Sequence, residues 1–130
     1  MVIDTSAVLA ILLNEPERRE FNEAIEAAES IGISAATFVE TSIVVEARFG
    51  SDGLRDLDLF LNLAKIELVD VDFEQAHAAR QAFSEFGKGR HSAGLNFGDC
   101  FSYALAKVRG ERLLFKGDDF GKTDIERFAS

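Results

Sequence analysis

The first six residues constrain the fold more than any other stretch, because a short apolar strand there runs directly into a carboxylate. Val2 and Ile3 are β-branched residues of the kind that buried strands favour. Asp4 follows at the expected carboxyl end of this strand, and Thr5 and Ser6 are suited to cap a helix over residues 7–13. Open α/β sheets bind their ligands at this edge. The opening therefore predicts an α/β protein whose functional site includes Asp4.

Strand-like and helix-like apolar patterns alternate along the rest of the chain. We expect strands at residues 31–34, 66–71 and 113–115, and helices at about 16–28, 37–49, 54–64, 76–86 and 97–108, with a last short helix near Asp124. Gly50 and Gly87 are placed to end the helices before them. The alternation predicts a single domain spanning residues 1–130, with a mostly parallel central sheet and helices on both of its faces.

The charge of the chain is strongly negative and unevenly distributed. Its formal value of −9 argues against broad, non-specific binding of nucleic acids. Residues 1–86 contain 6 Lys or Arg and 17 Asp or Glu, whereas residues 87–130 contain 8 and 6. Any polyanion is therefore expected to meet the C-terminal third of the chain.

Several classes of protein are excluded by what the sequence contains. The longest apolar run, residues 7–13, is far too short to span a membrane, and the opening does not have the pattern of a signal peptide, so we expect a cytoplasmic protein. Cys100 is the single cysteine, which excludes an intrachain disulfide and a cysteine-built zinc site. Beside Asp99, it is expected to be a small buried filler.

Acidic residues occupy comparable positions at several strand ends and helix starts. Asp4 ends the first strand, Glu40 and Asp99 lie near the starts of helices, and Asp118 and Asp119 follow the last strand. Carboxylates gathered at one sheet edge would repel one another, and a hard divalent cation with oxygen ligands would relieve that repulsion. Such a set suits metal-dependent phosphoryl chemistry. Spacing alone leaves other interpretations open, because Asp99 could serve only its helix terminus and the Asp118–Asp119 pair could be turn residues.

Four stretches of the sequence resemble the motifs of a known protein family, which is evidence that the spacing of the acids alone does not provide. In order they are VIDTSA at residues 2–7, SAATFVE at 34–40, GLNFGDCFSYALA at 94–106 and LLFKGDDF at 113–120. Together they resemble the PIN-domain ribonucleases, specifically the VapC toxins of bacterial toxin–antitoxin pairs. The resemblance covers essentially the whole chain. It implies a PIN fold, cleavage of RNA with the help of Mg²⁺ or Mn²⁺, a VapB-like cognate antitoxin and a homodimer.

The family's acidic site is carried over residue by residue. It falls on Asp4, Glu40 and Asp99, with Asp4 and Asp99 as the expected metal ligands. A fourth acid belongs in the last motif, where many relatives have one Asp at the position of Gly117 and another directly before the Phe. Asp119 matches the second of these positions, so we assign it the fourth catalytic role.

Three further residues are expected to support these carboxylates. Ser6 and Asn96 match family positions and are suited to orient carboxylates or metal-bound water, and Asp118 is the neighbour of the assigned fourth acid.

Two other functions compete with the ribonuclease. A phosphoacceptor receiver domain would use Asp70 or Asp72 after the third strand and Lys116 after the last, but it requires an acidic pair after the first strand and gives Glu40 and Asp99 no role. A PIN fold retained only as a binding module is the other alternative, against which the intact acids argue.

Overall fold

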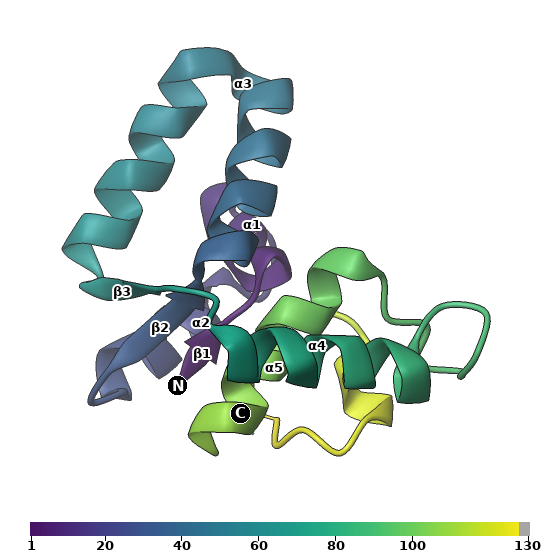
Figure 1. Ribbon diagram of the computed structural model, residues 1–130. Coiled ribbons are helices and arrows are strands. Elements are labelled where there is room, and N and C mark those ends of the chain that lie inside the picture. The colour runs from purple at the N-terminus through teal and green to yellow at the C-terminus, as the bar shows by residue number, and fades with distance from the viewer. Residues whose placement is uncertain (128–130) are drawn as a thin grey trace.

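The computed structural model of the protein describes residues 1–127. Along the chain it contains β1 (Val2–Ile3), α1 (Thr5–Leu12), α2 (Arg18–Ala27), β2 (Ile31–Ser34), α3 (Ala35–Leu63), β3 (Ile66–Val69), α4 (Phe73–Phe86), α5 (Phe97–Arg109), β4 (Leu113–Leu114) and a short 3₁₀ helix (Phe120–Lys122). The strands form one sheet in the order β3-β2-β1-β4, and every neighbouring pair is parallel. Figure 1 shows three of them, with β2 between β3 and β1. The predicted α/β fold with a parallel sheet is confirmed.

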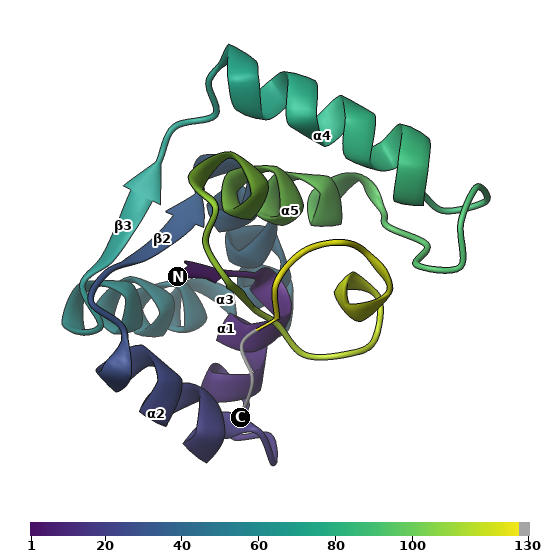
Figure 2. The same cartoon turned by 90° about the horizontal axis from the view of Figure 1, so that it is seen from below.

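Side chains that alternate along the strands build two separate cores, one on each face of the sheet. Val2 and Leu113 pack with residues of α4 and α5, whereas Ile3, Ile33 and Leu114 pack with residues of α1, α2 and α3. Figure 2 shows the same division, with α4 and α5 on one side of the strands and the other helices opposite. Helices therefore cover both faces, as the alternating pattern predicted.

Helix α3 consists of two arms that run in opposite directions from a sharp turn (Figure 1). The turn is at Gly50, whose φ of 66° and ψ of −155° no helix can accommodate. This is the break that the sequence predicted. The buried Gly53 lets the arms meet closely, because a Cβ there would lie 2.9 Å from Val45 Cγ1.

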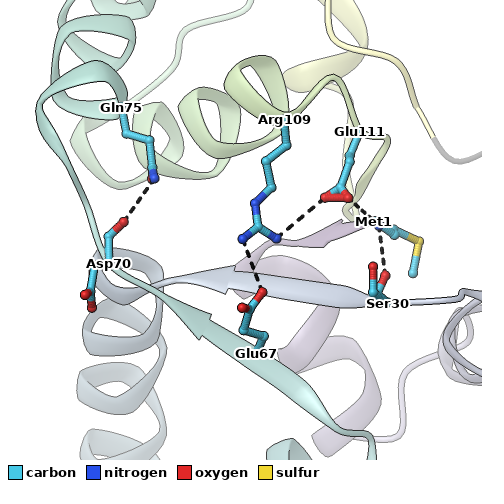
Figure 3. Close-up of polar contacts among 7 residues, drawn as sticks. All are labelled: Met1, Ser30, Glu67, Asp70, Gln75, Arg109 and Glu111. Atoms are coloured by element: carbon cyan, nitrogen blue, oxygen red, sulfur yellow. Dashed lines mark hydrogen bonds and ion pairs between the residues drawn. The ribbon is translucent and has the colours of Figure 1, made fainter.

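Ion pairs connect residues at the amino ends of the strands (Figure 3). Arg109 at the end of α5 contacts Glu67 of β3 at 3.2 Å and Glu111 at 3.9 Å. The terminal ammonium of Met1 donates to the carbonyl of Ser30 at 3.0 Å and lies 3.5 Å from Glu111. Polar side chains at this end of the sheet are thus paired with one another, and the residues proposed for the site lie at the opposite, carboxyl end.

Three local predictions were wrong. Asp4 rather than Thr5 or Ser6 caps α1, which begins at Thr5, because the Asp4 carboxylate accepts the N–H of Ser6. Helix α2 begins at Arg18, two residues after the proline that was expected to start it. Within the described residues no helix forms at Asp124, whose carboxylate is instead held by Tyr103 and Lys107 of α5.

None of the helices within residues 1–127 combines the length and the apolar character that crossing a membrane requires.

Candidate active site

Asp4 is the most deeply buried acid of the candidate site, with 3% of its surface exposed. It lies between β1 and α1, and its carboxylate is an acceptor on both oxygens. Oδ2 accepts the backbone N–H of Ser6 at 3.0 Å and the Ser6 hydroxyl at 2.7 Å, and Oδ1 accepts the Ser102 hydroxyl at 2.6 Å. Ser6, which the sequence suggested as a supporting residue, thus forms hydrogen bonds to Asp4, and its role in the chemistry stays a prediction.

Glu40, in the second turn of α3, connects the start of α1 to the start of α5. Its Oε1 accepts the hydroxyl of Thr5, the residue after Asp4, at 2.7 Å. Its Oε2 lies so close to Gly98 that a Cβ on that glycine would be 1.9 Å away. The carboxylate of Glu40 thus contacts the residue that follows Asp4 and the residue that precedes Asp99.

Asp99 lies in the first turn of α5 and forms a capping box with Asn96. The Asn96 side chain accepts the Asp99 N–H at 2.9 Å, and the Asp99 carboxylate accepts the Asn96 N–H at 3.0 Å. Burial raises the pKa of Asp99 to about 6, helped by the negative charges of Asp4, Glu40 and Asp119 and opposed by the Asn96 hydrogen bond. Asp99 thus caps the start of α5, and the negative charges of three other acids raise its pKa.

The last motif approaches the site through the segment after β4. The backbone N–H of Lys116 donates to the Ser6 hydroxyl at 2.9 Å, and Phe120 is buried with its ring 5.1 Å from that of Phe115. Both Asp118 and Asp119 are exposed. From this segment it is the charge of Asp119 that helps to raise the pKa of Asp99. The assignment of Asp119 as the fourth acid stays a prediction.

The donor set suits a hydrated hard cation better than a closed protein cage. Among residues 1–127 no three acidic, histidine or cysteine side chains converge closely enough to hold a metal ion by themselves. Mg²⁺, however, typically takes only one or two carboxylates and retains several waters. Asp4 and Asp99 offer carboxylate oxygens, and the acids around Asp99 supply the repulsion that a cation would relieve. The residues present therefore fit such an ion.

Two residues of the site were missed by the sequence reasoning. Ser102 contacts Asp4 across 98 residues of sequence, and no local pattern announces a contact of that kind. Gly98 stands next to Asp99 in the motif, and a glycine inside a helical pattern is a signal of close approach that could have been read.

The remaining candidates have structural roles. Burial, followed by the charge of Asp99, raises the pKa of Cys100 to about 11, so the thiol stays protonated at neutral pH and is no nucleophile. Asp72 caps α4 by accepting the N–H of Gln75 at 2.9 Å. The Lys116 ammonium lies 3.1 Å from Glu15. Asp72 and Lys116, two of the residues that a receiver domain would use, are thus engaged elsewhere, and this alternative is not favoured.

Comparison with known proteins also supports the resemblance to PIN-domain ribonucleases over nearly the whole chain. Residues 1–126 match the PIN domain family. The chain is 55% identical over 129 residues to Ribonuclease VapC30 of Mycobacterium tuberculosis, which covers 99% of this chain and 98% of that protein.

Two solved structures share the fold. The crystal structure of VapC20 of Mycobacterium tuberculosis, a toxin that cleaves the sarcin-ricin loop, has a TM-score of 0.79 at 14% identity and covers 99% of this chain and 98% of its own. A toxin–antitoxin complex from Klebsiella pneumoniae has a TM-score of 0.66 at 20% identity, with coverage of 95% and 92%. The chain therefore belongs to the PIN domain family and, within it, to the VapC ribonucleases.

Proposed function

We propose that the chain is the toxin of a toxin–antitoxin pair and that it hydrolyses RNA phosphodiester bonds in the cytoplasm with the help of Mg²⁺ or Mn²⁺. The observation that carries this proposal is the gathering of acids around the first turn of α5. The pKa of Asp99 is raised to about 6, in part by the negative charges of Asp4, Glu40 and Asp119. These four acids come from four separate parts of the chain.

The four carboxylates have distinct tasks in this proposal. Asp4 and Asp99 would hold the cation, which when bound polarises the phosphodiester and lowers the pKa of the attacking water. Glu40 and Asp119 would orient the attacking water. One of them would accept its proton, which would then pass to the oxygen that leaves the phosphorus. The hydroxyl of Thr5 at 2.7 Å keeps Glu40 directed into the site, and Ser6 and Asn96 hold the two metal-binding carboxylates. Asp118 supports the turn that carries Asp119.

Charge removal at the carboxylates tests the mechanism. Asp4→Asn and Asp99→Asn should each abolish cleavage of RNA and keep the fold, because a neutral amide cannot supply the charge that the cation needs. Asp58→Asn, at an exposed position in α3, is the matched control and should cleave normally. Cleavage should vanish in EDTA and return with Mg²⁺ or Mn²⁺. Undiminished cleavage in excess EDTA would refute the mechanism, and a wild-type chain that cleaves no RNA would favour the binding module.

An antitoxin is the second part of the proposal, supported by the shared fold of the Klebsiella pneumoniae toxin–antitoxin complex. A basic side chain from such a partner, above all an arginine, would pair with the carboxylates and block the site. The antitoxin should therefore inhibit cleavage. Replacement of the inserted arginine by alanine should restore cleavage and leave the two chains bound through their other contacts.

A homodimer is the third part, and exposed aromatic side chains support it. Phe73 and Phe97, at the starts of α4 and α5, are 86% and 78% exposed. Between these helices is an apolar groove of about 370 Å³, lined by Ala76, Ala79, Arg80, Phe83, Phe97, Cys100 and Phe101. A second copy would remove this apolar surface from water. Sedimentation should give a dimer that Phe97→Asp weakens, and a strict monomer at micromolar concentration would contradict the dimer only.

A further inference from the structure

Ser102 is a polar residue in the buried part of its helix, where a small apolar side chain would be expected. It lies on α5 and is completely buried. A buried hydroxyl is unfavourable unless it forms hydrogen bonds, and Ser102 forms two. It lies 2.6 Å from Oδ1 of Asp4 and 3.1 Å from the hydroxyl of Thr37 on α3.

The number of protons fixes the direction of both hydrogen bonds. A serine hydroxyl has one proton to donate, and an ionised carboxylate can only accept. The Ser102 proton therefore goes to Asp4, and the contact with Thr37 requires Thr37 to donate to Ser102. Two hydroxyls from two helices thus form a directed chain that ends on one oxygen of Asp4.

The other oxygen of Asp4 is held in the same manner. The backbone N–H of Lys116 donates to the Ser6 hydroxyl, which donates in turn to Oδ2. With the N–H of Ser6 also on Oδ2, that oxygen has both of its lone pairs engaged, while Oδ1 has one engaged by Ser102. A single lone-pair direction of the carboxylate remains free.

We propose that Ser102 is a positioning residue that fixes the carboxylate plane of Asp4 and would thereby leave one lone pair of Oδ1 available to a cation. The inference rests on the proposed metal-dependent function and assigns to Ser102 a role in metal affinity rather than in packing. Residues that orient metal ligands by hydrogen bonds typically change metal affinity by 10–100-fold when they are removed. Thr37 acts one step further away and should matter less.

Direct binding of Mn²⁺ without RNA, measured by titration calorimetry, tests this role. Ser102→Ala should weaken Mn²⁺ binding about tenfold, at the lower end of that range. Thr37→Val removes the hydroxyl that donates to Ser102 and keeps the shape of the side chain, so it should weaken Mn²⁺ binding by a smaller factor. Ser42→Ala is the matched control, because that hydroxyl only bonds the carbonyl of Phe38 one turn back on α3. It should bind Mn²⁺ like the wild type.

Thermal melts of the same variants in EDTA separate positioning from packing. A Ser102→Ala protein that melts earlier but binds Mn²⁺ with wild-type affinity would show that the serine only packs, and would overturn the proposal. Adding Ser102→Ala to Asp4→Asn should change Mn²⁺ affinity no further, because the serine acts through that carboxylate. A wild-type protein that binds no Mn²⁺ would instead overturn the metal-dependent function, and this inference with it.

Discussion

Replacement of Gly98 by alanine should separate the stability of this protein from its activity. Gly98 lies in the first turn of α5 with its Cα against the carboxylate of Glu40. A Cβ built there would lie 1.9 Å from Oε2 and 2.5 Å from Cδ of Glu40. The contacted atoms are the far end of a flexible side chain, so the carboxylate should swing away and the backbone should stay in place.

The size of the effect follows from these distances. To restore an ordinary contact of about 3.4 Å, Oε2 must retreat by about 1.5 Å. A displacement of about 1 Å at a catalytic group can lower a rate about a hundredfold, which corresponds to about 2.7 kcal/mol. The fold should lose little, because alanine favours a helix interior over glycine by about 0.5–1 kcal/mol. We therefore expect cleavage to fall about a hundredfold while the melting temperature stays unchanged or rises.

Cleavage of a fluorogenic RNA and thermal melts of the same samples give both numbers. Gly121→Ala is the matched control, because an added Cβ there would meet nothing within 4 Å. A double variant with Glu40→Gln should be no slower than Glu40→Gln alone, since Gly98 is expected to act through Glu40. Wild-type cleavage by Gly98→Ala would refute this reasoning, as would a further loss of rate in the double variant.

Two other predictions concern the remaining acids. Asp119→Ala should lower the rate of cleavage about a hundredfold, the equivalent of about 3 kcal/mol of transition-state stabilisation. Asp118→Ala should cleave within a few fold of wild type. The reverse result would show that the fourth acid is Asp118. Because Asp99 has its pKa raised to about 6 from 3.8, the native metal-free chain holds a proton between these pH values that the unfolded chain has lost. The stability contributed by Asp99 is therefore present at low pH and lost as the pH rises through 6. Asp99→Asn should accordingly raise the melting temperature in EDTA more at pH 7.5 than at pH 5, and an equal gain at both would contradict the assigned pKa.

The sequence predicted well those features that depend on local patterns. Val2 and Ile3 before an acid identified the first strand as buried, and Gly50 identified the break in α3, because backbone geometry there excludes a continuous helix. The capping residue of α1 was misassigned, since Asp4, Thr5 and Ser6 are all good caps and only the fold decides among them.

Contacts between distant segments were beyond the reach of the sequence. The hydrogen bond from Ser102 to Asp4 does not follow from propensity or spacing, because it depends on how α5 and β1 are packed. A glycine inside a helical pattern signals a close approach at Gly98, but only the packing of α3 against α5 identifies Glu40 as the partner. The absence of a helix at Asp124 in the part of the chain that the structure describes has the same origin. That carboxylate is used by Tyr103 and Lys107, so a local capping signal was overridden by tertiary contacts.

The parallel sheet also determines when the candidate site of a growing chain can first assemble. The central strand β1 pairs with β4, where Val2 is opposite Leu113, so two stretches made at opposite ends of translation must meet. Until then a nascent chain carries Asp4 and Glu40 without Asp99 and Asp119, and contacts this distant in sequence form late. The four acids of the candidate site can therefore come together only after nearly all of the chain has been synthesised.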